Sequence, residues 1–309
     1  MCGRDGNVCG RRYPVALYVA RPRIGVVTAI DAVHAERAGD LDAIEAAKGE
    51  LVEELPADGF ALLAADDPRV LRLRARTAAH VILVGIAEGS DIRILSAELD
   101  QSSARTAVVL SIAGEQIAVD LPLFGVHFAR AAAFAIGVAN VCGVDLHLAA
   151  QRLSAFELPG GRTAVQTLGG VRVIDDSYNA APSSMAAALT TLGTARGARF
   201  AALGAMGELG RYSAEAHLAI GRAAAESGLT ALLVFGTEAD GIAEGARSAG
   251  MPVDQIVRLS ADERGIAAGA GLIADRARTG DTVLIKASRA VALERLVTAL
   301  RERLNGGVA

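Results

Sequence analysis

Short apolar runs rich in β-branched residues alternate with longer stretches of helical periodicity along most of the 309 residues. The apolar runs predict strands at Ile24–Thr28, Phe60–Ala64, Val81–Ile86, Val171–Asp175, Phe200–Gly204, Leu229–Phe235, Gln255–Leu259 and Thr282–Lys286. The longer stretches predict helices that begin near Leu41, Pro68, Pro182, Ser213, Ala239, Ala261 and Arg289. Strands that alternate with helices indicate β-α-β units, so we expect an α/β fold with parallel sheets.

One interval departs from this alternation. Between Asp91 and Leu123, apolar and polar residues alternate in short runs at Ile92–Leu99, Thr106–Ile112 and Gln116–Leu121. A period of two predicts strands with one buried face, and we expect an antiparallel meander attached to the first sheet. A helix rich in small residues, from His127 to Val141, is expected to follow.

Turn-forming residues divide the chain into two parts. The segment Leu158-Pro-Gly-Gly-Arg162 stands just before the second series of β-α-β units and predicts a linker. We therefore expect a first domain at residues 14–157 and a second at residues 158–309, with residues 1–13 unassigned. Two domains also suit a chain of 309 residues.

Two of the predicted helices begin with residues that are typical of helix starts. Ser260 is followed three residues later by Glu263, which predicts a capping box. Pro182 suits the first turn of a helix, where its missing N–H has no partner to lose.

Composition and charge narrow the class of protein. The chain is 52% hydrophobic and 21% charged with a formal net charge of −4, so it can bury a large core and is not expected to bind nucleic acid or an anionic membrane surface through bulk charge. The longest apolar stretch, Ala131–Cys142, is too short to span a bilayer, so no membrane insertion is expected. The N-terminus lacks the apolar core of a secretory signal. The three cysteines have no C-x-x-C spacing, which predicts a cytoplasmic location without disulfides.

Lys48 interrupts an apolar helix face. Apolar residues recur around it at steps of three and four, at Leu41, Ile44, Leu51 and Leu55. The chain has only one other lysine, Lys286. In one interpretation the Lys48 stem packs against the core and its ammonium reaches water. In the other, burial lowers the pKa of Lys48 and leaves a neutral, nucleophilic amine. The pattern leaves both open.

A polar cluster, Ile174-Asp-Asp-Ser-Tyr-Asn179, follows a predicted strand directly. Carboxylate, hydroxyl and amide groups at the carboxyl end of a parallel strand suit a phosphate or sugar site. The same residue types also favour an Asx-rich turn that caps the next helix, which is the more frequent outcome.

Glycines recur at steps of three in Leu203-Gly-Ala-Met-Gly-Glu-Leu-Gly210, between a predicted strand and a predicted helix. This segment resembles a nucleotide loop but lacks G-x-G-x-x-G spacing, so the indication is weak. No G-x-x-x-x-G-K-[ST] sequence occurs in the chain, and a Walker A phosphate loop is therefore not among its motifs. His34 and His217, taken singly, favour ordinary polar contacts.

Taken in order, these motifs resemble those of the Mur ligase family. In the first half the matching segments are Arg21-Pro-Arg-Ile-Gly-Val-Val-Thr28, His34-Ala-Glu36, Ala47-Lys48-Gly-Glu50, Ala65-Asp-Asp-Pro68 and Gly125-Val-His127. In the second half they are Pro159-Gly-Gly-Arg162, the stretch 174–185, the stretch 203–210 with His217, and Lys286-Ala-Ser-Arg289. The ordered set, including the 14-residue step from His34 to Lys48, carries the resemblance.

The resemblance implies a fold and an activity. Residues 14–157 would be part of the central ATPase domain, a parallel sheet with an antiparallel meander, and residues 158–309 a Rossmann-like C-terminal α/β domain. ATP would phosphorylate the terminal carboxylate of UDP-MurNAc-tripeptide, and the amine of D-Ala-D-Ala would attack the acyl phosphate and release phosphate. Such chemistry is part of peptidoglycan synthesis.

The resemblance also assigns site residues. Lys48, as a carbamate, and His34 would stand beside Mg²⁺, while Arg162 would contact phosphate and Asp176 the ribose of ATP. The closing face of the site would be lined by Ser177, Tyr178 and Asn179. We expect domain closure about the linker near residue 158.

The chain also departs from the family pattern. The family's UDP-sugar-binding domain and P-loop have no counterpart here, so a missing N-terminal half is an expected partner. Alanine also replaces motif residues that the family usually conserves, at Ala29, Ala64, Ala181, Ala205 and Ala287. Two alternatives therefore stay open, a non-catalytic binding module or relic of a Mur ligase and a folylpolyglutamate synthase or cyanophycin-type ligase.

The missing half also has a structural consequence. A strand expected at the centre of the first sheet would lie at its edge, with unpaired backbone groups. We therefore expect the first domain to be marginally stable alone and residues 158–309 to fold independently.

Overall fold

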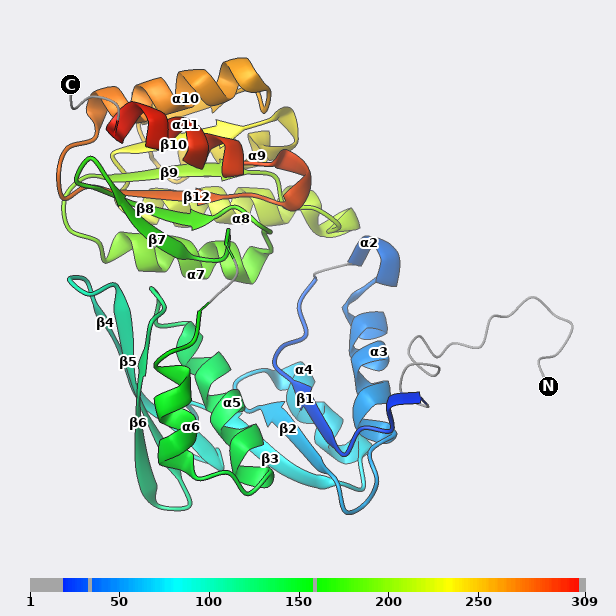
Figure 1. Cartoon of the computed structure of the whole chain (residues 1–309). Coiled ribbons are helices and arrows are strands. Elements are labelled where there is room, and N and C mark those ends of the chain that lie inside the picture. The colour runs from blue at the N-terminus through cyan, green and yellow to red at the C-terminus, as the bar shows by residue number, and fades with distance from the viewer. Residues whose placement is uncertain (1–18, 33–34, 158–159, 306–309) are drawn as a thin grey trace, which may run out of the picture.

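The computed structural model describes residues 19–32, 35–157 and 160–305. Within these residues the chain forms two six-stranded sheets, each with helices packed against it (Figure 1). Every strand of the first sheet precedes every strand of the second along the chain, and the two sheets form separate layers of the molecule. The α/β fold class predicted from the sequence is confirmed. The division at residues 157 and 158 stays a prediction, because residues 158 and 159 lie outside the described residues.

The strands of the first sheet follow one another in chain order. They are β1 (Ile24–Val27), β2 (Phe60–Ala64), β3 (His80–Gly85), β4 (Ile92–Asp100), β5 (Arg105–Ile112) and β6 (Glu115–Leu121). The pairs from β1 to β4 are parallel, and β4, β5 and β6 form the predicted antiparallel meander. Strand β1 is an edge strand of the described sheet, in agreement with the expectation of an open edge.

Five helices accompany the first sheet. They are α2 (Ala35–Ala38), α3 (Leu41–Glu53), α4 (Pro68–Arg72), α5 (Phe128–Val141) and α6 (Leu146–Leu153) among the described residues. Helix α5 packs against β2 to β5, α6 against β6 and α3 beside β1. The small residues of α5 allow close packing: an added Cβ at Gly137 would lie 2.5 Å from Ile92 Cδ1. One continuous apolar core results.

The second sheet has the strand order β11-β10-β9-β12-β8-β7. Its strands are β7 (Ala164–Leu168), β8 (Val171–Asp176), β9 (Arg199–Gly204), β10 (Ala231–Phe235), β11 (Ile256–Leu259) and β12 (Thr282–Lys286). Strand β7 is antiparallel to β8, and the other pairs are parallel. The central strands β9, β10 and β12 are almost continuously buried because helices cover both faces.

Helices cover the two faces of the second sheet unequally. One face packs against α7 (Pro182–Gly193), α8 (Ser213–Glu226) and α9 (Asp240–Ser248), and the other packs against α10 (Glu263–Arg276) and α11 (Glu294–Asn305). The helices that follow the adjacent strands β8 and β12 therefore lie on opposite faces. Such a switch point leaves a crevice outside the carboxyl ends of the strands, where ligands of open α/β sheets bind.

Most of the predicted strands begin and end, and most of the predicted helices begin, within one or two residues of the observed positions, and three differences stand out. The predicted capping box at Ser260 is wrong, because Asp262 caps α10 and accepts from the Gly265 N–H at 2.9 Å. The helix expected near Arg289 begins at Glu294, after a short 3₁₀ turn. The sequence patterns also missed β7 and α6. Pro182 stands at the first position of α7, as predicted.

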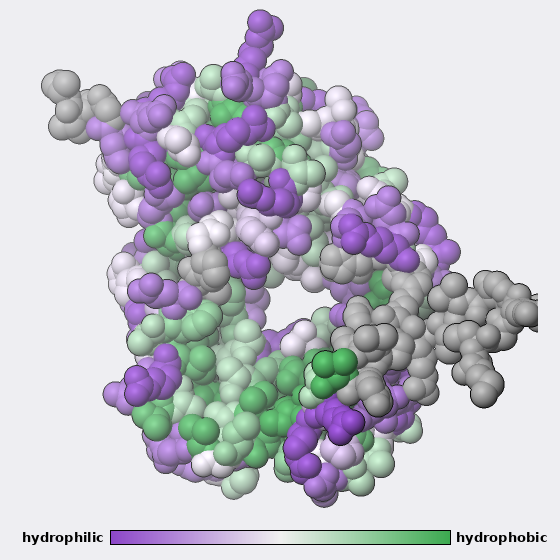
Figure 2. Space-filling view, turned by 45° about the vertical axis from the view of Figure 1, so that its right-hand side comes forward, coloured by the Kyte–Doolittle hydropathy of each residue, from purple (hydrophilic) through white to green (hydrophobic). Residues whose placement is uncertain are grey.

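Two hydrogen-bonded contacts join the first sheet and its helices to the second, and Phe124, which follows β6, is buried in the apolar core of the second sheet. In the hairpin contact, between β4 and β5, Arg172 donates to Gln101 Oε1 at 3.1 Å and to the Gln101 carbonyl, and Gln101 Nε2 donates to Thr194 Oγ1 at 3.0 Å. In the α2 contact, the Glu36 N–H donates to the Glu208 carbonyl at 3.1 Å. Figure 2 shows an opening between the two parts of the molecule.

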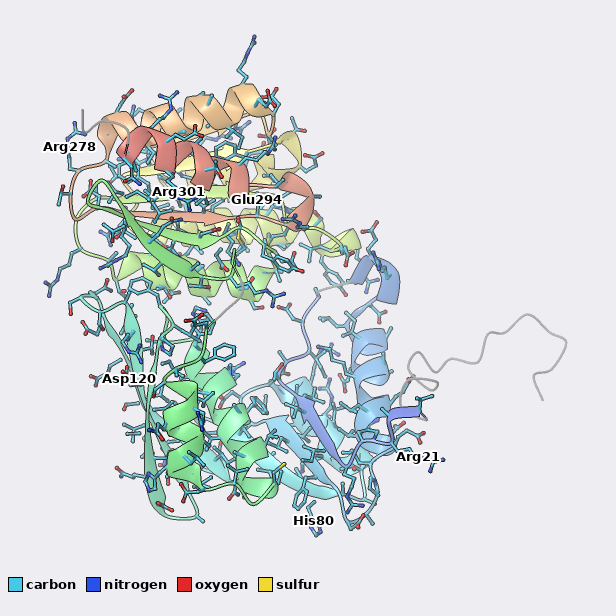
Figure 3. All side chains as sticks on the ribbon, in the orientation of Figure 1. Arg21, His80, Asp120, Arg278, Glu294 and Arg301 are labelled. Carbon is cyan, nitrogen blue, oxygen red and sulfur yellow. The ribbon has the colours of Figure 1, made fainter. Side chains whose placement is uncertain are left out.

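Charged side chains project from the outside of both parts. Asp120 on β6 and Arg278 and Arg301 beside the second sheet all project outward (Figure 3). Among the described residues, no helix combines the length and the apolar character needed to cross a bilayer.

Candidate active site

The most buried ion pair of the described residues lies at the switch point of the second sheet. Asp176 ends β8 and Lys286 ends β12, and the two are register partners of this parallel strand pair. Lys286 Nζ donates to Asp176 Oδ2 at 2.5 Å, with 3% of the Lys286 side chain and 15% of the Asp176 side chain exposed. Lys286 Nζ also donates to the Asn179 carbonyl at 3.0 Å.

A second group holds the other oxygen of Asp176. Oδ1 accepts from the Thr163 N–H at 3.0 Å and from Thr163 Oγ1 at 3.2 Å. Thr163 has φ of 52°, a left-handed conformation that is strained for a β-branched residue. The strain is compensated by two hydrogen bonds to one carboxylate oxygen.

The segment that follows Asp176 forms a compact turn. Ser177 is buried and donates through Oγ to Asp175 Oδ1 at 2.6 Å, and Asn179 Oδ1 accepts from the Ala180 N–H at 2.9 Å. Asp175 Oδ1 also accepts from the Ser177 N–H at 3.2 Å, which is the Asx-turn bond considered from the sequence. The turn does not cap the next helix, because the N-cap of α7 is Ala181. These bonds within the turn do not involve the Asp176 carboxylate, which accepts from Thr163 and Lys286.

Arg162 and Tyr178 form the exposed side of this cluster. The guanidinium carbon of Arg162 lies 4.3 Å from the centroid of the Tyr178 ring, a cation–π arrangement. The Tyr178 N–H donates to the Gly161 carbonyl at 2.9 Å, which fixes the strand of chain that carries Arg162. The structure thus brings Arg162, Asp176, Ser177, Tyr178 and Asn179 together.

Lys48 lies on α3 in the first part of the molecule and is half-buried. Its Nζ donates to the Ala29 carbonyl at 2.6 Å. Burial lowers the pKa of Lys48, although the negative charges of Asp31 and Asp67 act in the opposite direction. The amine is therefore neutral more often than that of an ordinary lysine. The predicted partner His34 lies outside the described residues.

Two carboxylates stand near Lys48. Asp67 caps α4 and also accepts from the Ile30 N–H at 2.8 Å, so it ties the loop after β1 to the start of α4. Asp31 Oδ2 is buried without a hydrogen-bond partner. Within the described ranges, no three His, Cys, Asp or Glu residues are grouped so as to hold a metal.

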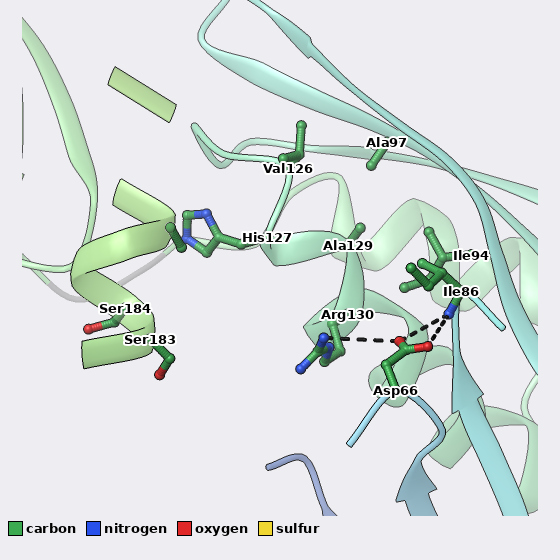
Figure 4. A pocket seen from close by; sticks show the side chains of 11 residues that line it. Asp66, Ile86, Ile94, Ala97, Val126, His127, Ala129, Arg130, Ser183 and Ser184 are labelled. Atoms are coloured by element: carbon green, nitrogen blue, oxygen red, sulfur yellow. Dashed lines mark hydrogen bonds and ion pairs between the residues drawn. The ribbon is translucent and has the colours of Figure 1, made fainter. Parts of the chain in front are cut away.

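A cavity of about 560 Å³ opens between the two parts of the molecule (Figure 4). It is lined by Asp66, Ile86, Ile94, Ala97, Val126, His127, Ala129, Arg130, Ser183, Ser184 and Ala187. The His127 ring points toward the start of α7, which carries Ser183 and Ser184. Surrounding protein withdraws part of this ring from water and lowers the pKa of His127, with Asp176 raising it and Lys286 lowering it further. His127 therefore connects the cavity with the Asp176–Lys286 pair.

The glycine-containing segment 203–210 has a structural role in the described residues. His217 is buried, its Nε2 accepts from the Met206 N–H at 3.0 Å, and its Nδ1 donates to the Ser213 carbonyl at 2.7 Å. The ordinary polar contacts expected of His217 are confirmed. Glu208, at the far end of the segment, has φ of 61° and forms the α2 contact.

Sequence reasoning named Lys286 and His127 only as parts of motifs and did not select them as site residues. Lys286 lies 110 residues from Asp176 along the chain, so no local pattern links them. The rarity of lysine was the one available indication.

The fold and this cluster define a two-part α/β protein with a polar site at the carboxyl ends of parallel strands and a cavity between its parts. Comparison with protein families specifies the class further: residues 12–139 match the Mur ligase middle domain and residues 161–289 match the Mur ligase glutamate ligase domain. The chain belongs to the Mur ligase family.

Two of the curated relatives carry the same enzyme name. The chain is 33% identical over 302 residues to UDP-N-acetylmuramoyl-tripeptide--D-alanyl-D-alanine ligase of Mycobacterium tuberculosis H37Rv, covering 91% of this chain and 58% of the relative. It is 27% identical to the Escherichia coli K12 ligase of the same name, covering 92% of this chain and 61% of that one. The chain thus spans about three fifths of the length of these curated relatives.

Solved structures agree in fold. The MurF ligase of Thermotoga maritima in complex with ADP superposes with a TM-score of 0.79 at 26% identity, over 94% of this chain and 64% of that one. MurF of Acinetobacter baumannii superposes with a TM-score of 0.84 at 24% identity, over 95% and 63% of the two chains.

Proposed function

We propose that the chain forms the nucleotide-binding and carboxylate-activating part of an ATP-dependent ligase that joins D-Ala-D-Ala to UDP-MurNAc-tripeptide. The observation that carries the proposal is the Asp176 cluster, which stands at the switch point of the second sheet, within electrostatic range of His127 in the cavity wall. The names of the relatives support the choice of substrates.

The nucleotide would contact the second sheet. Asp176 would accept a hydrogen bond from the ribose, and the exposed guanidinium of Arg162 would approach a phosphate. The surrounding face would be formed by Ser177, Tyr178 and Asn179. The name of the Thermotoga maritima structure, which includes ADP, supports a nucleotide in this family.

The reaction has two steps. A carboxylate oxygen of the tripeptide attacks the γ-phosphorus of ATP, so that an acyl phosphate forms and ADP leaves. The D-Ala-D-Ala amine then attacks the acyl carbon, an amide bond forms, and inorganic phosphate leaves with the bonding electrons of the C–O bond. Protein groups in such reactions chiefly position reactants and neutralise charge.

Lys48 would act on the metal side of the site. A lysine with a lowered pKa has a larger share of neutral amine, which can add to carbon dioxide and become an anionic carbamate. The buried, unbonded oxygen of Asp31 is also a donor of the kind that Mg²⁺ prefers, so these residues fit a metal. Mg²⁺ would supply charge neutralisation for the phosphates, with the Lys48 carbamate and His34 beside it.

A turnover experiment tests the proposal. The chain is incubated with ATP, Mg²⁺, UDP-MurNAc-tripeptide and D-Ala-D-Ala, and the ligated product is measured by mass spectrometry together with phosphate release. Product that depends on all four components supports the ligase. Parallel reactions with a folate and glutamate, or with a cyanophycin primer and aspartate, in place of both substrates distinguish it from a folylpolyglutamate or cyanophycin-type ligase.

One observation favours a second candidate function. The 309 residues contain no G-x-x-x-x-G-K-[ST] sequence to hold the β- and γ-phosphates. A binding module that works with a P-loop on another polypeptide would bind ATP without turnover. Absence of both ATP binding and turnover contradicts both candidates. A cytoplasmic location stays a prediction.

A further inference from the structure

We propose that Lys286 is a positioning residue for nucleotide recognition, which holds the Asp176 carboxylate in the orientation that accepts a ribose hydroxyl. The inference rests on the proposed function, which assigns Asp176 to the ribose. It adds a residue that contacts no substrate and acts through another side chain.

The geometry around Lys286 fixes two parts of the site at once. Its ammonium donates to Asp176 Oδ2 at 2.5 Å and to the Asn179 carbonyl at 3.0 Å. One buried cation thus joins the end of β8 to the turn that follows it. Because Lys286 ends the neighbouring central strand, its position is set by the sheet and not by a loop.

Counting acceptor positions shows what remains open at Asp176. A carboxylate offers about four lone-pair positions. Thr163 occupies two of them through its N–H and Oγ1, and Lys286 occupies a third. Among the described residues one acceptor position is left, on a side chain that is 15% exposed. A single hydroxyl donor would complete the set.

The charge balance explains why a lysine suits this place. An unpaired carboxylate at this depth would be costly, and a neutral aspartic acid would turn one acceptor into a donor. The Lys286 ammonium supplies the opposite charge at this depth and donates to the carboxylate. The orientation is held from both sides, because Thr163 binds Oδ1 and Lys286 binds Oδ2.

The test compares two nucleotides on the full chain. Dissociation constants for ATP and for 2′,3′-dideoxy-ATP, which lacks both ribose hydroxyls, are measured by calorimetry for the wild type, Lys286→Met, Thr163→Val and Asp176→Asn. We expect the wild type to prefer ATP about tenfold, the size of one hydrogen bond to a charged group. In Lys286→Met and Asp176→Asn the ratio of the two constants is expected to fall to about one, and in Thr163→Val to an intermediate value.

A matched control separates positioning from general loss of stability. Asp281 is also buried and lies just before the amino end of β12, where its carboxylate accepts from Ala198 N–H at 2.8 Å and Arg278 N–H at 2.7 Å. Asp281→Asn is expected to lower stability and to keep the tenfold preference. If Lys286→Met does not fold, Lys286→Gln retains a neutral donor and is expected to show a reduced ratio.

Each outcome has a distinct meaning. A Lys286 variant that keeps the wild-type preference overturns the inference and leaves the proposed function intact. A wild type that binds ATP and dideoxy-ATP equally well overturns the ribose assignment of Asp176, and the inference with it. A wild type that binds neither nucleotide contradicts the proposed function itself.

Discussion

Lys286 and Asp176 end two adjacent parallel strands and meet in an ion pair that is almost closed to solvent, with 3% of the lysine side chain exposed. Ion pairs of this depth lose much hydration, so each partner depends on the other. The pair is therefore a stability element as well as part of the candidate site.

The ion pair predicts that substitutions of Lys286 and Asp176 have coupled effects on the free energy of unfolding. Lys286→Met leaves a shielded carboxylate without its cation and is expected to lower the free energy of unfolding by about 3 kcal/mol. The double variant Asp176→Asn/Lys286→Met removes both charges and is expected to recover most of that loss. Urea denaturation of the wild type, Lys286→Met, Asp176→Asn and the double variant measures the coupling energy between the two residues. If the losses of the two single variants simply add up in the double variant, the predicted coupling is contradicted.

The left-handed backbone at Thr163 predicts that glycine is more stabilising than alanine there, the reverse of the usual order. At φ of 52° glycine avoids a strain of about 1 kcal/mol that alanine retains. Thr163→Gly is therefore expected to unfold at higher temperature than Thr163→Ala, although both lose the hydroxyl bond to Asp176. Thr167, exposed in β7, is the control, since extended backbone favours alanine over glycine there. If the glycine and alanine variants have the same order of unfolding temperatures at both positions, backbone strain at Thr163 is contradicted.

Lys48 predicts a pH effect on stability. Because burial lowers the pKa of Lys48 in the folded state, the unfolded chain binds more protons between the folded pKa and the ordinary value of 10.5. Stability from this group therefore rises as pH rises through that window. Lys48→Met should abolish the rise, which denaturation between pH 7 and pH 10 in carbonate-free buffer would measure. If the free energies of unfolding of Lys48→Met and the wild type change in parallel with pH, the lowered pKa of Lys48 is refuted.

His217 predicts a local effect on the segment 203–210. Its Nε2 accepts from the buried Met206 N–H, so His217→Leu leaves that donor unsatisfied at a cost of about 2 kcal/mol. Hydrogen exchange at the Met206 amide is expected to accelerate. His147, which is exposed and paired with Glu115, is the control, and its leucine variant should change stability by less than about 0.5 kcal/mol. Unchanged Met206 protection in His217→Leu would count against this role.

The open edge at β1 predicts unequal resistance to proteolysis. Strand β1 pairs only with β2 in the described sheet, whereas β8, β9, β10 and β12 have strands on both sides. Limited digestion is expected to give a stable fragment that begins near residue 158 and to degrade the first part sooner. A digest that leaves no stable C-terminal fragment would contradict independent folding of the second part.

Local patterns were enough to predict most of the fold. Parallel strands buried on both faces produce apolar runs, and the meander has alternating residues because helices cover only part of it. Strand β7 was missed because its sequence, Ala164–Leu168, includes two polar residues and stands directly after turn residues. The cap of α10 was misplaced because Ser260 and Asp262 are both good capping residues, and only the backbone shows that Asp262 bonds to Gly265.

The candidate site was predictable only where its residues are neighbours in sequence. The segment 174–179 carries several polar groups after one strand, so its pattern is visible. Lys286 and His127 approach it from other strands and helices, and their proximity depends on the strand order of the second sheet and on the packing of α5. A single sequence contains no local trace of such pairings.

The two contacts between the parts of the molecule also limit how they move. Because Phe124 also lies in the apolar core of the second sheet, separation on the hairpin side would expose a buried aromatic ring as well as break hydrogen bonds. The α2 contact includes the solvent-exposed pair Arg37–Glu208, with 77% of the Arg37 side chain exposed, and such pairs contribute little. At the hairpin contact Arg172 donates to Gln101, and its guanidinium also lies over the ring of Phe124, which comes from outside the hairpin. The α2 contact is therefore expected to break more readily than the contacts on the hairpin side.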